Sequence, residues 1–374
     1  MTVRCYGGYA DGLRIVDPVD EHVVRTLADC RIESLAVVPA AETPAETGDA
    51  PAAAGDEPVG AGREPAPATG DPWVFAGTFE SGLFRSVDGG ETFERIAAAT
   101  LGPGGSGPDA VTAVATSPHD AAVVWVGTEP SRVYRSTDGA ETVSRIQGVT
   151  DVPSASEWSF PPRPDTHHVR CLAASPADPD RWIVGIEAGA LLVTPDGGDT
   201  WVDRPPGSRR DTHTLATHPA APSRVYAAAG DGFAESDDGG QSWTVVTRGL
   251  DHGYLWGLAV DPGDPETALV SAATGANAAH RRGDSVLYRR VSRDDPLPGA
   301  PTERAAGPRF ERLTGTGIPT GSGTYRAVLA SGVSSGSIWA LTNQGLYHTA
   351  DGGDSFVRID VSLPAEPAQA LAVG

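Results

Sequence analysis

Short apolar runs of strand length, separated by glycine-rich polar turns, recur along the whole chain. The clearest run is an apolar residue followed by Ala, two further residues and Pro, as in 35–39. Its copies start at Leu35, Val114, Leu172, Leu215 and Leu258, with weaker copies at Val328 and Leu371. The steps from 172 to 215, from 215 to 258 and from 328 to 371 are each 43 residues. A repeat of about 40–45 residues built from short strands is the size of one four-stranded β-propeller blade.

Three further strands are predicted in each repeat. The third strand has a sequence like the Gly-Leu-Phe-Arg of 82–85, and the fourth strand follows a tight turn. The repeat that starts at Leu258 lacks the turn but keeps a third strand at 286–289 and a fourth at 310–313. The second strands are rich in β-branched and aromatic residues and are predicted at 73–78, 123–128, 181–186, 224–229, 268–274 and 337–342.

The turn before the fourth strand has a sequence of its own, Ser/Thr-x-Asp-Gly-x-x-Thr/Ser, followed in four of its five copies by an aromatic residue and in one by Val143. The carboxylate can bond backbone N–H groups of the turn, while the glycines after it supply positive φ. We therefore predict a structural role for the five aspartates, which are Asp88, Asp138, Asp196, Asp238 and Asp351.

The seventh repeat has its first strand at Leu371 and no others after it. Residues 6–15 read like a second and third strand, and 22–27 like a fourth. We therefore predict an all-β, seven-bladed β-propeller of four-stranded blades, closed by N- and C-terminal strands sharing one blade. Residues 1–374 are predicted to form a single domain, with a disordered acidic insert at 40–72 that is rich in Pro, Ala and Gly.

The repeated turn resembles the Asp-box (BNR) repeat of sialidase-like, photosystem-assembly-factor-like and WD40/YVTN-like β-propellers. In such propellers the loops before first strands and after second strands share one face, which is the usual ligand mouth. The aspartate turns lie on the other face. The resemblance therefore implies a propeller fold with a binding role at the mouth, and it covers nearly the whole chain.

Candidate site residues follow from counting two or four positions back from the apolar residue that begins each repeated run, such as Leu35 or Leu172. These positions would form a polar funnel, with arginines as fork-shaped donors and Trp256 as a stacking platform. The simpler alternative is that arginines and acids only satisfy each other across the channel. The predicted rim is Glu33, His168, Arg170, Asp211, His213, Tyr254, Trp256 and Arg326, joined by Glu187 from a loop after a second strand.

The favoured function is a non-catalytic binding or assembly platform for a protein or for a small anionic or carbohydrate ligand. The alternative is a sialidase-like glycoside hydrolase or a lyase that uses the same funnel. The sialidase resemblance implies an arginine triad, for which Arg170 and Arg326 are candidates, but no third arginine and no Tyr–Glu pair can be assigned. No catalytic residue, metal or cofactor is therefore predicted.

The net charge of −21, with 28 basic residues that are all arginine, predicts a protein of a salt-loving prokaryote, such as a haloarchaeon. The same charge disfavours nucleic acid and anionic membranes as partners. The three cysteines are too few and too irregularly spaced for a disulfide framework or a zinc site. No signal peptide or membrane span is visible, so we expect a cytoplasmic monomer.

Overall fold

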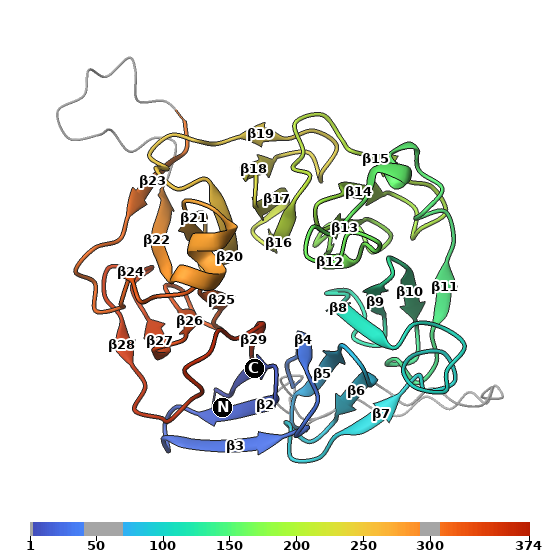
Figure 1. The fold of residues 1–374 in the computed structure, drawn as a ribbon, viewed down its shortest axis with the longest axis horizontal. Helices are drawn as coiled ribbons and strands as arrows, with labels where there is room; N and C mark the ends of the chain where they lie inside the picture. The colour runs from blue at the N-terminus through green and yellow to red at the C-terminus, as the bar shows by residue number, and fades with distance from the viewer. Residues whose placement is uncertain (1–2, 41–69, 292–306) are drawn as a thin grey trace, which may run out of the picture.

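Seven antiparallel sheets stand around a central axis in the computed structural model, which describes residues 3–40, 70–291 and 307–374 (Figure 1). Six sheets have four strands, and the seventh carries one additional short strand. The prediction of an all-β, seven-bladed propeller with four-stranded blades is therefore confirmed.

The strands run from the axis outward in chain order within every blade except the one shared by the two ends (Figure 1). That shared blade comprises β29 (Ala370–Val373), β1 (Cys5–Tyr9), β2 (Gly12–Asp17) and β3 (His22–Thr26). The second blade comprises β4 (Ile32–Val38), β5 (Trp73–Thr78), β6 (Gly82–Ser86) and β7 (Glu94–Ile96). The third comprises β8 (Ala110–Thr116), β9 (Val124–Glu129), β10 (Val133–Ser136) and β11 (Ser144–Ile146). The fourth comprises β12 (Val169–Ala174), β13 (Trp182–Ile186), β14 (Ala190–Thr194) and β15 (Val202–Asp203).

The fifth blade comprises β16 (Thr212–His218), β17 (Ala221–Ala229), β18 (Gly232–Ser236) and β19 (Thr244–Val245). The sixth comprises β20 (Tyr254–Asp261), β21 (Asp264–Ala273), β22 (Asp284–Val291) and β23 (Arg309–Arg312), with β24 (Gly321–Ser322) beside β22. The seventh comprises β25 (Val328–Ser331), β26 (Ile338–Thr342), β27 (Gly345–Thr349) and β28 (Val357–Arg358). The described loops contain two short helical turns, η1 (Pro153–Glu157) and η2 (Ala278–Arg282).

The core lies between neighbouring blades, because each sheet is covered on both faces. Strands β13 and β14 are buried at every position, which is why their sequences read as continuous apolar runs rather than as alternating ones. Trp125 of β9 stacks on Trp182 of the next blade with ring centroids 4.5 Å apart. Truncating either ring to Ala would cost about 3–5 kcal/mol of stability.

Each aspartate turn is held by the same set of hydrogen bonds. In the first, the Ser86 hydroxyl donates to Asp88 Oδ1 at 2.7 Å and accepts from the N–H of Gly90 at 2.7 Å. The N–H of Thr92 donates to Asp88 Oδ1 at 2.9 Å. Corresponding bonds recur at the other four turns, around Asp138, Asp196, Asp238 and Asp351.

The glycine after each aspartate also ties the turn to the start of its own second strand. The N–H of Gly89 donates to the Pro72 carbonyl at 3.1 Å, and that of Gly197 to the Asp180 carbonyl at 2.7 Å. These glycines have φ near +70°, a conformation that a side chain disfavours. The aspartate turns therefore share one face of the ring with the turns between first and second strands.

The two ends of the described chain meet inside one blade, as predicted. Strand β29 pairs with β1 in antiparallel register, with Cys5 opposite Val373 (Figure 1). Beyond it, Arg4 and Gly374 exchange two backbone hydrogen bonds of 2.7 and 3.0 Å. This pairing gives β1, which would otherwise be a free inner edge, a complete set of neighbours.

The predicted acidic insert at 40–72 falls largely on 41–69, which lies outside the described residues. Cys5, Cys30 and Cys171 are free thiols. Within the described residues, no helix is both long enough and apolar enough to cross a membrane.

Candidate functional site

A cavity of about 690 Å³ lies at the end of the ring where first strands begin and second strands end. This is the end opposite the aspartate turns. Most of the residues predicted for the rim line it: Glu33, His168, Arg170, Glu187, Asp211, Tyr254, Trp256 and Arg326. The remaining one, His213, packs against the rings of Tyr254 and Trp256, and its side chain is 1% exposed.

A β-bulge positions one side chain on five of the inner strands. In β12, pairing passes from Val169 opposite Ile186 to Cys171 opposite Gly185, and Arg170 is skipped. A bulge of this kind bends the strand and re-aims the extra residue, and bulges are common beside functional sites. The equivalent irregularities fall at Glu33 in β4, Thr112 in β8, His213 in β16 and Trp256 in β20.

Two arginines lie over the indole of Trp256. The guanidinium carbons of Arg170 and Arg326 are 4.6 and 4.2 Å from the ring centroid. Trp256 is only 6% exposed, so it does not offer the open stacking face that sequence reasoning expected. It serves instead as an aromatic support on which two cations rest through cation–π contact.

Arg326 is fixed by its neighbours, while Arg170 is not. Arg326 donates to the Ala368 carbonyl at 2.6 Å and to Gln369 Oε1 at 2.7 Å. Burial, reinforced by the charge of Arg170, lowers the pKa of Arg326 to about 9, so it remains a cation at neutral pH. Among the described residues, the guanidinium of Arg170 has one ionic contact, from Nε to Glu187 Oε2 at 3.6 Å, and no hydrogen bond.

His280 connects the second arginine to a tyrosine. Arg326 Nε lies 3.1 Å from His280 Nδ1, and Tyr254 Oη lies 2.9 Å from His280 Nε2. Because a guanidinium can only donate, Nδ1 accepts and Nε2 carries the proton. Burial and the charge of Arg326 lower the pKa of His280 to about 3, which keeps this ring neutral.

Two acids lie near the arginines, Glu187 in the same blade as Arg170 and Asp211 at the start of the next blade. Glu187 accepts from His168 Nε2 at 2.9 Å through Oε2. Burial would raise the pKa of Glu187, but this hydrogen bond and the charges of His213 and Arg170 outweigh it and lower the pKa to about 2. For Asp211, burial and the charge of Glu187 raise the pKa despite nearby His213.

The cavity has the opposite charge balance to the chain. Of the residues that the structure describes, five arginines and three acids line it, whereas the whole sequence carries a net charge of −21. Two of the five arginines, Arg31 and Arg163, are paired within 2.5 Å of Glu33 and Glu129. The arginines that line it are Arg31, Arg163, Arg170, Arg281 and Arg326.

Sequence reasoning missed the part of the wall that comes from the long loops. Phe160 and Arg163 belong to the loop before β12, and His280 and Arg281 belong to η2. Counting back from first strands cannot reach these positions, since they lie outside the repeat. The only signal was the length of the two loops and their aromatic, histidine and arginine content.

No protein-family model matches the sequence, and no curated protein matches it. Among solved structures, the GH74 enzyme of Niastella koreensis matches with a TM-score of 0.62 and 13% identity over 99% of this chain and 52% of that one. The GH74 xyloglucanase from Xanthomonas campestris matches with a TM-score of 0.60 and 16% identity over 99% of this chain and 52% of that one. YCF48 bound to a D1 peptide matches with a TM-score of 0.48 and 16% identity over 76% of this chain and 78% of that one, a likeness too weak to carry an argument.

The chain therefore spans about half the length of the two GH74 enzymes. At identities of 13 and 16%, their likeness to this chain shows the propeller fold alone.

Proposed function

We propose that this protein is a non-catalytic binding propeller whose cavity holds the anionic group of a small ligand or of a protein segment. The observation that carries the proposal is the state of Arg170. Its side chain is 10% exposed and lies over Trp256, yet no hydrogen bond within the described residues uses its donors. A buried guanidinium with free donors is an incomplete site that a carboxylate or phosphate can complete in a bidentate way.

The surroundings of Arg170 support the same reading. Arg326 is 3% exposed and adds a second positive charge over the same ring. The excess of arginine over acid in the cavity attracts anions there, although the protein as a whole repels them. A cavity of about 690 Å³ is also within the usual size of small-molecule sites.

Matched pairs of probes test the proposal by isothermal titration calorimetry, in salt that keeps the protein folded. One pair is a set of short peptides with free or amidated carboxyl ends, and the other is acidic or neutral oligosaccharides. We expect binding by charged members only, weakened at least tenfold by Arg170→Gln. Arg145→Gln, on exposed β11, is the matched control and should bind as the wild type does. Equal binding of charged and neutral members, or full binding by Arg170→Gln, would contradict the proposal.

Glycoside hydrolysis in the same cavity is the second candidate. Glu187 and Asp211 both line the cavity, and each has a carboxylate oxygen within 4.8 Å of the other. A pair of neighbouring carboxylates is what most glycosidases use for catalysis. Turnover of fluorogenic glycosides or xyloglucan oligosaccharides that disappears in Asp211→Asn would favour this candidate, and no turnover of any of them would remove it.

We also infer that the chain is an Asp-box propeller adapted to concentrated salt. The five aspartate turns share one hydrogen-bond pattern, which supports a common repeat. The charge of −21 and the absence of lysine support the adaptation to salt.

A further inference from the structure

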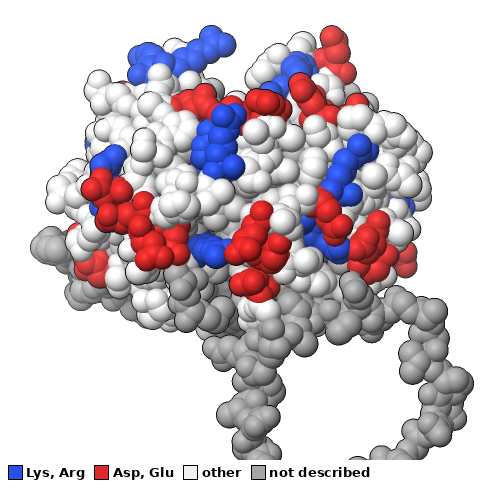
Figure 2. All heavy atoms as spheres, turned by 90° about the horizontal axis from the view of Figure 1, so that it is seen from below, with Lys and Arg blue, Asp and Glu red and all other residues white. Residues whose placement is uncertain are grey.

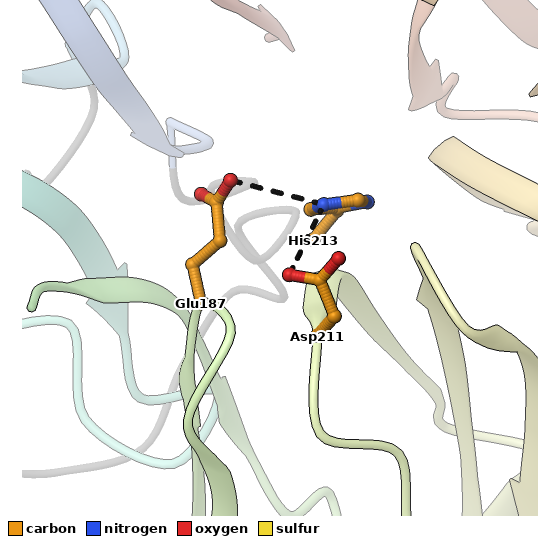
Figure 3. A group of neighbouring side chains, drawn as sticks. All are labelled: Glu187, Asp211 and His213. Atoms are coloured by element: carbon orange, nitrogen blue, oxygen red, sulfur yellow. Dashed lines mark ion pairs between the residues drawn. The ribbon is translucent and has the colours of Figure 1, made fainter. Parts of the chain in front are cut away.

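Three side chains from two adjacent blades converge at one side of the cavity (Figure 3). Glu187 follows β13, Asp211 precedes β16, and His213 lies within β16. His213 Nε2 is 3.7 Å from Asp211 Oδ1 and 3.8 Å from Glu187 Oε1. One ligand atom from each residue lies within 4.8 Å of the other two.

The orientation of His213 is fixed by the backbone. Its Nδ1 is 2.6 Å from the Leu255 carbonyl, which can only accept, so Nδ1 carries a proton. In the neutral ring the lone pair of Nε2 then faces two carboxylate oxygens. No hydrogen bond within the described residues reaches Nε2, although the side chain is 1% exposed.

At 3.7 and 3.8 Å the two carboxylate oxygens are too far from Nε2 to accept a hydrogen bond from it. A metal ion between the three groups fits these distances. Nitrogen and oxygen ligands at about 2.0–2.2 Å from a tetrahedral zinc ion are about 3.4 Å apart. The two distances from His213 to the carboxylates exceed that by only a few tenths of an ångström.

Each of the three side chains also has a second partner that holds it toward the others. Leu255 orients His213, as above, and the N–H of Ala188 donates to Asp211 Oδ1 at 2.9 Å. His168 and Arg170 contact Oε2 of Glu187, and so leave Oε1 for the shared centre. Such outer partners are the rule for metal ligands, whose direction and basicity they set.

We propose that Glu187, Asp211 and His213 bind one divalent metal ion, with Zn²⁺ as the best fit. One imidazole and two carboxylates form a mixed nitrogen–oxygen set suited to Zn²⁺, and three protein ligands leave a fourth position open. Asp211 is 31% exposed and lines the cavity, so the open position faces the cavity. The site does not depend on the proposed anion ligand, which is assigned to Arg170.

The test is metal binding by the tag-free, chelator-treated protein, measured by calorimetry with Zn²⁺ and by visible absorption with Co²⁺. We expect one equivalent of Zn²⁺, a Co²⁺ spectrum of low-coordinate nitrogen and oxygen ligands, and a metal-dependent rise in the unfolding temperature. Asp211→Asn and His213→Gln should each weaken binding at least tenfold. His252→Ala, which removes a half-buried histidine bonded to Tyr288, is the matched control and should bind normally.

The two ligand variants, Asp211→Asn and His213→Gln, keep the proposal testable if one of them fails to fold. Asp211→Asn should fold, because Asp211 is partly exposed and Asn has the same shape as Asp. Absence of Zn²⁺ and Co²⁺ uptake by the wild type at millimolar concentrations would overturn the proposal. Wild-type affinity in folded Asp211→Asn would overturn it as well. The anion proposal is tested with its own probes on the chelator-treated protein, so its failure can be told apart from failure of this one.

Discussion

Arg326 and Arg170 show how a propeller can hold two like charges in its interior. A buried cation is tolerated when its donors are occupied, and Arg326 has the Ala368 carbonyl and Gln369 for that purpose. Among the residues that the structure describes, Arg170 has the ring of Trp256 and, at 3.6 Å, the carboxylate of Glu187. The difference between these neighbouring arginines separates a structural cation from one that is available to a ligand.

At the same scale, the aspartate turns make a prediction about acid stability. Although slight burial would raise it, hydrogen bonds from Ser355 and Thr349 lower the pKa of Asp351 to about 2. A folded-state pKa below the ordinary value of about 3.9 means that the carboxylate stabilises the fold above that pH. This contribution is lost as the pH falls from about 4 toward 2.

We therefore expect Asp351→Ala to lower the free energy of unfolding by about 1–2 kcal/mol at pH 7. The gap to wild type should shrink at pH 3. Denaturant unfolding at the two pH values measures it, with Asp360→Ala as the control, since Asp360 is exposed and outside the turn. A gap that is the same at both pH values would show that the charge of Asp351 is not what stabilises the turn.

At the scale of the strand, the closing pair β1 and β29 allows a direct test of ring closure. Arg4 and Gly374 form a hydrogen-bonded pair, so the adjacent pair, Cys5 and Val373, is of the non-hydrogen-bonded type with closer side chains. Cys5 is 1% exposed and Val373 packs in the same cluster. A cysteine at 373 is thus well placed for a disulfide.

We expect Val373→Cys to crosslink to Cys5 on oxidation and to raise the free energy of unfolding by about 2–4 kcal/mol. Comparing oxidised and reduced protein by thermal unfolding, together with a thiol count, measures the effect. Val373→Ser separates the crosslink from the loss of the valine. If the thiols stayed unreacted in folded, oxidised protein, the register of this pair would be wrong.

Many of the strands could be predicted from the sequence, because the repeated run keeps its spacing wherever strand pairing fixes the register. The phrase that starts at Leu172 marks a fixed register, and two positions before it lies the bulged residue Arg170. Counting back therefore located the wall of the cavity without any knowledge of the bulge. It could not show that Trp256 would be covered by two arginines, or that His280 of a loop would reach the same place, since neither depends on the repeat.

At the scale of the whole molecule, acidic and arginine side chains lie interspersed on the side of the ring (Figure 2). Ion pairs such as Arg224–Asp237 and Arg289–Asp354 lie at the surface, where an isolated pair contributes little. The remaining excess of negative charge opposes the compact state at low ionic strength. Dissolved salt screens that repulsion over about 3 Å at 1 M, compared with about 30 Å at 0.01 M.

We expect the unfolding temperature to rise steadily as potassium chloride increases from the millimolar to the molar range. Circular dichroism during heating measures it, and an equal series in a neutral osmolyte gives the effect of reduced water activity alone. An unfolding temperature that did not depend on salt would mean that self-repulsion is unimportant in this fold.

The shared blade has a consequence for folding during synthesis. During synthesis at about 5–20 residues per second, β1 leaves the ribosome tens of seconds before β29 exists. During that time the inner edge of β1, which includes the free thiol of Cys5, has no β29 to pair with. The nascent ring is therefore an open arc until β29 is made. Until then the unpaired edge of β1 is exposed to strand pairing with other chains.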